Sequence, residues 1–283
     1  MNSSIVDLQK YNEEGFININ NFWDNDMLLA FEKTFYELLK MQAYKMRIDI
    51  PKESENLYND ISNLCILLNN KSSFSLDQVF QMLRETKTAY DLMASNDIIE
   101  IAEKIFNIPS DLVKIHMDGI LINIPTNVSR LYTWHSESHY YPIRNNFFNT
   151  WTPLLCDKNT SNGTMLIKKG SHKGNYTFNE FIGYEERDNH QKSAFHQLDV
   201  PEDEIEDYEG VEMNIKRNSL IIFNKNMIHR STLNISKKCS FAMVIRFFEY
   251  SKDLTLSHSH RIKPYTQEYI NAGYPQLRKY HKN

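Results

Sequence analysis

The chain has 283 residues, 41% of them hydrophobic and 24% charged, which is an ordinary composition for a soluble globular protein. Its formal net charge of -4 predicts no general attraction to nucleic acid or to anionic membranes. No stretch approaches the roughly 18 to 20 apolar residues of a membrane helix, and the N-terminal residues lack the pattern of a signal peptide. Cys65, Cys156 and Cys239 lie far apart without metal-type spacing, so we expect reduced thiols in a cytoplasmic protein.

The first part of the chain has the patterns of helices. Residues 11–19 predict the end of a helix, a glycine turn and a short strand. Further helices are predicted over residues 25–42, from a capping box at Ser75 and Gln78 to about Met93, and from Ile98 to a point before Pro109.

From Leu112 onward the sequence is rich in β-branched and aromatic residues. Strands are predicted over residues 112–124, 131–141, 147–155, 163–168, 219–224 and 239–249. Helices followed by one long run of strands favour a mainly β protein with flanking helices, of the α+β class, whose core is a double-stranded β-helix or jelly roll. We expect a single domain with a helical part over about 1–110, a jelly-roll core over about 111–250 and a C-terminal extension over 251–283. The acidic residues 183–210 are predicted to form a surface insertion.

The segment Trp134-His135-Ser136-Glu137 is the main candidate for chemistry. On a strand, side chains two residues apart point to the same face, so His135 and Glu137 would project together. A second imidazole from a later strand, His229, would complete a triad of two histidines and one carboxylate. Such a triad occupies half of an octahedral iron site and leaves the other half for a co-substrate and dioxygen. His116-Met117-Asp118 has the same spacing, and spacing alone does not separate the two pairs.

The order of several short motifs does separate them. After His135 come Asn149 to Leu154 with Trp151, Asn162-Gly163, Gly170-Ser171-His172-Lys173, His229-Arg230-Ser231 and Asn234-Ile235-Ser236. This succession, with Glu13-Glu14-Gly15-Phe16 near the start, resembles the phytanoyl-CoA dioxygenase family of Fe(II)/2-oxoglutarate-dependent oxygenases. The resemblance covers most of the chain and implies His135, Glu137 and His229 as the iron ligands. It makes the 116–118 segment a supporting element beside them.

The chain departs from the family pattern at three positions. Glu137 stands where the family usually has aspartate, and Lys169 replaces a proline. The third departure concerns the arginine that clamps the far carboxylate of 2-oxoglutarate in this family, four residues after the serine of Asn-x-Ser. Ser240 occupies that position here.

Arg246 is the predicted replacement for the missing clamp. On one strand, Ser240 and Arg246 share a face, roughly 20 Å apart at about 3.3 Å per residue. A structural Arg246 paired with an acidic side chain is the alternative, and Lys237 and Lys238 are weaker candidates that we expect to face solvent. The resemblance also implies that Trp151 and Ser231, with Ser240, line the co-substrate pocket.

The function that the resemblance implies is hydroxylation of a small organic metabolite with dioxygen, with Fe(II) as cofactor and 2-oxoglutarate as co-substrate decarboxylated to succinate and CO2. The intact carboxylate at position 137 argues against halogenation, which needs that coordination position for halide. The alternative is a jelly-roll metal-binding protein that does not turn over 2-oxoglutarate, because the family arginine is missing.

Overall fold

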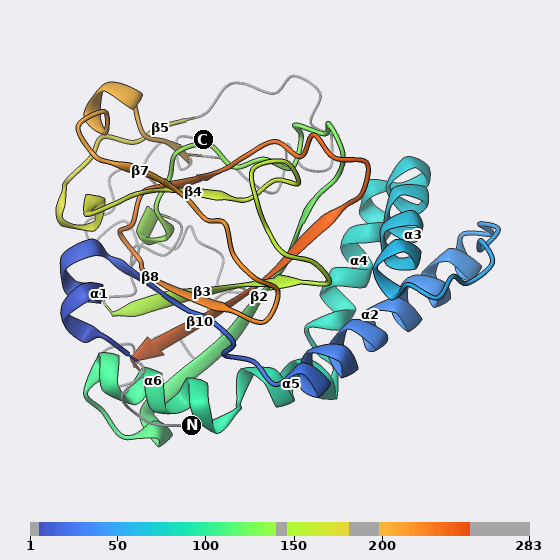
Figure 1. Cartoon of the computed structure of the whole chain (residues 1–283), viewed down its shortest axis with the longest axis horizontal. Helices are drawn as coiled ribbons and strands as arrows, with labels where there is room; N and C mark the ends of the chain where they lie inside the picture. The colour runs from blue at the N-terminus through green and yellow to red at the C-terminus, as the bar shows by residue number, and fades with distance from the viewer. Residues whose placement is uncertain (1–5, 140–145, 181–197, 250–283) are drawn as a thin grey trace, which may run out of the picture.

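The computed structural model describes residues 6–139, 146–180 and 198–249 (Figure 1). Its largest sheet is antiparallel and has the order β1 (Phe16–Ile19), β8 (Leu220–Asn224), β3 (Phe147–Leu154), β10 (Ser240–Glu249) and β2 (Val113–Asn123). A second antiparallel sheet has the order β7 (Gly210–Glu212), β4 (Met165–Lys168) and β9 (His229–Ser231). A short ladder joins β5 (Asn179–Glu180) to β6 (Leu198–Asp199). The α+β class is confirmed, and the paired antiparallel sheets fit the predicted jelly roll.

In the part of the chain that the structure describes, six α-helices precede most of the strands: α1 (Leu8–Glu14), α2 (Asn25–Lys45), α3 (Leu57–Lys71), α4 (Ser73–Leu83), α5 (Lys87–Met93) and α6 (Asn96–Phe106). Figure 1 shows α2 to α6 gathered along one side of the larger sheet. Helix α2 begins where the Asp24 carboxylate accepts hydrogen bonds from the backbone N–H groups of Asp26 and Met27. None of the described helices combines the length and the apolar character needed to cross a bilayer.

Alternation along β10 separates two hydrophobic cores. Phe241, Met243, Ile245 and Phe247 belong to the core shared with the helices. Ala242 and Val244 belong to the core between the two sheets, where they meet Met165 and Ile167 of the smaller sheet. Each fully buried Phe, Ile or Met contributes roughly 1.5 to 3 kcal/mol. This strand is therefore held on both faces, and its inward positions are fixed relative to the smaller sheet.

Most of the predicted elements are present, with some corrections. Helix α2 and helix α6 match the helices predicted over 25–42 and before Pro109. The helix predicted to start at Ser75 begins earlier, because Ser72 is the capping residue, and it is divided into α4 and α5. Helix α3 and strands β5, β6 and β7 lie outside the predicted segments, whereas β9 is the later strand on which His229 was expected.

The strand predicted over residues 131–141 was wrong. The described part, 131–139, is a loop with an isolated bridge at His135, and it ends in a 3-10 turn over Glu137–His139. Individual backbone hydrogen bonds, not a continuous ladder, fix this loop. His135 exchanges two of them with His229, and the Ser138 N–H donates to the Lys225 carbonyl. Of the predicted insertion 183–210, residues 198–210 are described and contain β6 and a 3-10 turn. The C-terminal extension 251–283 lies outside the described residues.

Gly15 ends α1 in a left-handed conformation, with φ of 84°, and leads directly into β1. A Cβ at this position would lie 2.2 Å from Met227 Cε and 2.4 Å from His172 Nδ1. Gly170 has a similar φ of 80°, but a Cβ there would meet no atom within 4 Å. Gly15 is therefore required for close packing as well as for backbone conformation.

We predict that Gly15→Ala lowers the free energy of unfolding more than Gly170→Ala does. Both variants pay about 1 kcal/mol for a left-handed alanine. Gly15→Ala additionally displaces buried Met227, at a cost of roughly 1 to 3 kcal/mol. Urea unfolding of both variants measures the difference, and equal losses would contradict the packing role of Gly15.

Candidate metal centre

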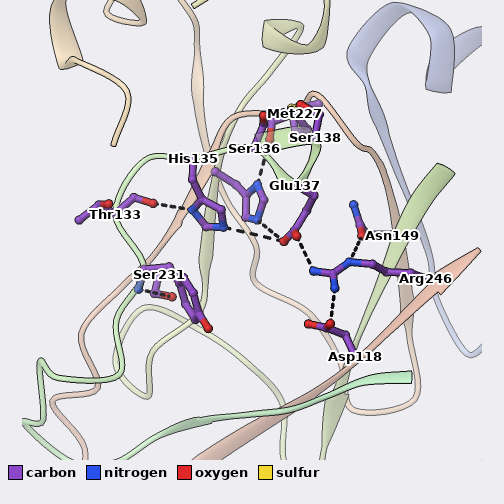
Figure 2. A network of polar contacts seen from close by, with 12 residues as sticks. Asp118, Thr133, His135, Ser136, Glu137, Ser138, Asn149, Met227, Ser231 and Arg246 are labelled. Atoms are coloured by element: carbon purple, nitrogen blue, oxygen red, sulfur yellow. Dashed lines mark hydrogen bonds and ion pairs between the residues drawn. The ribbon is translucent and has the colours of Figure 1, made fainter. Parts of the chain in front are cut away.

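Two histidines and one glutamate converge between the loop at 131–139 and strand β9. His135 and His229 face each other across an antiparallel bridge, and their ring centroids are 4.2 Å apart. Glu137 opens the 3-10 turn that follows (Figure 2). One ligand atom from each of the three residues lies within 4.8 Å of the others, and all three side chains are buried. The structure therefore brings the predicted triad together, although the loop and not a regular strand does so.

Hydrogen bonds to the main chain orient both imidazoles. His135 Nδ1 lies 2.6 Å from the Thr133 carbonyl oxygen, and His229 Nδ1 lies 2.9 Å from that of Met227. A carbonyl oxygen can only accept, so each Nδ1 carries the proton and donates it. The two Nε2 atoms are left with lone pairs, and both face Glu137 Oε1. Histidines that bind a metal through one ring nitrogen typically donate a hydrogen bond from the other, as Nδ1 does here.

The donor atoms lie close enough together to reach a common ion after a small inward movement. Glu137 Oε1 lies 3.8 Å from His135 Nε2 and 3.7 Å from His229 Nε2. These distances are too long for hydrogen bonds. Ligands that are each about 2 Å from one ion in octahedral geometry lie about 3 Å apart, so the three side chains would each move slightly inward to bind it. Two imidazole nitrogens and one carboxylate oxygen form a donor set that fits iron(II).

The electrostatic environment keeps these groups in the protonation states that a metal needs. Burial, and then the neighbouring His135, lower the pKa of His229 to about 3, so its imidazole is neutral at physiological pH. Burial alone would raise the pKa of Glu137. Arg246 and the two histidines outweigh that effect and lower its pKa below the ordinary value, so the carboxylate is ionised.

Arg246 holds the other oxygen of Glu137. Its Nη2 pairs with Glu137 Oε2, its Nη1 pairs with Asp118 Oδ1, and its Nε donates to Asn149 Oδ1 over 2.9 Å (Figure 2). The side chains of Arg246 and Glu137 are only 5% and 11% exposed, so their pairing is shielded from solvent, whereas Asp118 is 31% exposed. Arg246 thereby fixes Glu137 with Oε1 turned toward the histidines.

A bulge in β2 places Asp118 in this network. Val244 of β10 pairs with Gly119, and the next residue pairs with Met117, so Asp118 has no opposite residue. His116 lies opposite Arg246 in the same ladder. The rival segment 116–118 is therefore next to the triad and supports Arg246, as the resemblance implied. Among the described residues, the cluster of possible metal ligands consists of His135, Glu137 and His229 and does not include this segment.

The remaining predicted pocket residues lie on the surfaces that face the space between the sheets. Ser231 is two residues after His229, and its Oγ accepts from the Tyr132 N–H over 3.3 Å. Trp151 belongs to the inter-sheet core and is opposite Val244 in the ladder. Ser240 is fully buried at the start of β10, and its hydroxyl accepts a hydrogen bond from Lys158 Nζ over 2.7 Å.

Sequence reasoning missed two residues of this region, Asn149 and Lys158. Asn149 lies in a strand of apolar neighbours, and its pairing with Arg246 depends on the register between β3 and β10. Lys158 belongs to the polar run Asp157-Lys158-Asn159-Thr160-Ser161-Asn162, which has the composition of an exposed turn. No local pattern distinguishes it from a solvated lysine.

Solved structures with the same fold include several enzymes with iron or 2-oxoglutarate. EctD from S. alaskensis with bound Fe matches with a TM-score of 0.58 at 16% identity, over 88% of this chain and 78% of that chain. EvdO2 from Micromonospora carbonacea var. aurantiaca complexed with 2-oxoglutarate matches with 0.52 at 12%, over 86% and 89%. The epimerase SnoN in complex with Fe3+, alpha ketoglutarate and nogalamycin RO matches with 0.54 at 12%, over 85% and 81%. At these identities the similarity establishes the fold.

Comparison with curated proteins gave no match. The family model for phytanoyl-CoA dioxygenase (PhyH) matches residues 11–241, a span that includes the metal triad and Ser240. The chain therefore belongs to the phytanoyl-CoA dioxygenase family of iron(II)- and 2-oxoglutarate-dependent oxygenases.

Proposed function

We propose that this protein hydroxylates a small organic metabolite with dioxygen, and that His135, Glu137 and His229 bind its iron(II). The observation that carries the proposal is the shared orientation of two Nε2 lone pairs and one carboxylate oxygen toward a common point. Iron(II) bound there would couple decarboxylation of 2-oxoglutarate to succinate and CO2 with oxidation of a substrate C–H bond. Trp151, Ser231 and Ser240 are proposed to line the co-substrate pocket.

The protein excludes water from the triad and orients Glu137 without help from a substrate. Burial of all three ligands keeps bulk water away from the metal position. Arg246 pairs with one oxygen of Glu137, so the other oxygen would remain available to hold iron(II). This pairing is the structural role that was the alternative to a clamp for Arg246, and it supports that alternative.

We further propose a single catalytic domain and a cytoplasmic location. The domain proposal is supported by one hydrophobic core that contains both α2 to α6 and the larger sheet. The location is supported by three cysteines that are all free.

We expect 2-oxoglutarate to bind the iron directly. Adding it to the anaerobic Fe(II)-loaded protein should produce a visible metal-to-ligand charge-transfer band. The absorbance titration checks this outcome. Metal bound without such a band would favour the alternative of a jelly-roll metal-binding protein that does not turn over 2-oxoglutarate.

We predict that His229→Ala abolishes iron binding and succinate release, because one of three protein ligands is lost and no other described histidine joins the ligand cluster. His172→Gln is the matched control, since His172 lies in a 3-10 turn and contacts the Asn12 carbonyl through Nε2. The control should retain both iron binding and turnover. Succinate release by His229→Ala at the unaltered rate would refute the ligand assignment.

A further inference from the structure

Lys158 is a fully buried lysine at the end of the inter-sheet space. Its backbone is fixed by two hydrogen bonds with Ile215, of 2.8 and 2.9 Å. Its side chain points inward, and the residue is 1% exposed. The Nζ atom donates to Asn123 Oδ1 over 2.6 Å, to Ser240 Oγ over 2.7 Å and to the Gly163 carbonyl over 2.9 Å. Its Nζ also lies 5.8 Å from the centre of the Trp151 ring.

These acceptors are all neutral. Among residues 6–139, 146–180 and 198–249, no ion pair involves Lys158, and the adjacent Asp157 pairs instead with Lys216. A charged ammonium taken out of water is costly unless an anion compensates it. A buried lysine with neutral partners therefore favours the binding of an anion from outside the protein.

The place that Lys158 reaches is the position at which this family has its carboxylate-binding arginine. That position is Ser240, and Lys158 Nζ approaches its hydroxyl from the segment that follows β3. The positive charge is thus retained at this point of the fold although the residue that carries it lies 82 positions away in sequence. Arg246, in contrast, has its three nitrogen positions committed to Glu137, Asp118 and Asn149.

The span from the metal triad to Lys158 follows the smaller sheet. Ile167 of β4 is opposite His229 of β9, and Met165 is opposite Ser231. Gly163, whose carbonyl accepts from Lys158, lies two residues before β4 and four before Ile167, and an extended chain of that length spans roughly 13 Å at about 3.3 Å per residue. An imidazole, a metal bond and a five-carbon dicarboxylate would together extend over such a span, with Met165 and Trp151 alongside.

We propose that the Lys158 ammonium, together with the Ser240 hydroxyl, binds the distal carboxylate of 2-oxoglutarate. This assignment rests on the function proposed above, and it replaces Arg246 as the clamp. The carboxylate would take one of the three donor positions of Lys158. The Ser240 hydroxyl, which donates to the Asn162 carbonyl, would turn its proton to the same anion. Lysine then supplies a point charge where the family's arginine supplies a planar fork.

The protonation of Lys158 is consistent with this role. Burial lowers the pKa of Lys158 to about 7. Burial also raises the pKa of the neighbouring Cys156 and Cys239 thiols, so they are neutral at pH 7 and do not balance an ammonium. A carboxylate beside the ammonium would raise its pKa again, so binding of the anion and protonation of Lys158 support each other.

The test compares 2-oxoglutarate with 2-oxobutyrate, which keeps the chelating 2-oxo acid but lacks the distal carboxylate. Dissociation constants of both acids are measured by absorbance titration of the anaerobic Fe(II) protein. We expect the unaltered protein to bind 2-oxoglutarate roughly 100-fold more tightly than 2-oxobutyrate, because a buried charge pair is worth that much. Lys158→Met should reduce the ratio to about 5-fold or less, with the affinity for 2-oxobutyrate unchanged.

Two further variants sharpen the comparison. Lys158→Gln removes the charge but keeps an amide donor, and it should also lose most of the selectivity. Lys238→Met is the matched control, because Lys238 is two residues from Ser240 in sequence but is exposed and hydrogen-bonds Asn59. It should keep the full ratio. Circular dichroism and bound iron confirm that each variant is folded and metal-loaded.

The outcomes separate the clamp from the proposed function. If the unaltered protein forms no charge-transfer band with either acid, the proposed function fails and the clamp fails with it. If the band forms and the Lys158 variants keep the roughly 100-fold ratio, only the clamp is overturned. Should both variants misfold, a crystal structure of the unaltered protein with Fe(II) and 2-oxoglutarate decides: the distal carboxylate on Lys158 Nζ supports the assignment, and on any other residue overturns it.

Discussion

The pair of backbone hydrogen bonds between His135 and His229 is the constraint on which the site depends. Each bond is 3.0 Å long, and together they place the two imidazoles opposite each other although the residues are far apart in sequence. The loop that carries His135 has no longer ladder to hold it, so this bridge sets its register against β9. Glu137 can then reach both rings because the 3-10 turn begins two residues later. A shift of the bridge by one residue would turn His135 to the other face.

Strand β10 connects the metal triad with the other end of the space between the two sheets. Its outward residues pack against the helices, and its inward residues are Ser240, Ala242, Val244 and Arg246. Arg246 and Ser240 mark the two ends of that row, and the small side chain of Ala242 lies between them. Two residues of this one strand therefore have separate roles: Arg246 orients Glu137, and Ser240 contacts Lys158. Packing of the outward aromatic residues keeps both in place.

The sequence was sufficient where local spacing or motif order carried the information. Alternation correctly predicted that Arg246 shares a face with Ser240, and the order of motifs selected His135 over His116. Spacing gave the correct pairing of His135 with Glu137 for an incorrect reason, because a loop with a bridge replaces the predicted strand. The partners of Arg246 and Lys158 come from other segments, and they depend on strand register and on a bulge at Asp118. A lysine in a polar turn is usually exposed, so its burial could not be predicted.

Charge balance connects the two ends of the site. Arg246 compensates one of the two carboxylates that it contacts, so Asp118, Glu137 and Arg246 together carry one negative charge. Bound iron(II) would make that group positive by one, and the dianionic co-substrate would then make it negative by one. The ammonium of Lys158 would bring the whole assembly to neutrality. A buried site with no net charge avoids most of the desolvation cost of its parts. The same reasoning favours Lys158 over Arg246 as the proposed clamp, because the protein already balances the charge of Arg246 but not that of Lys158.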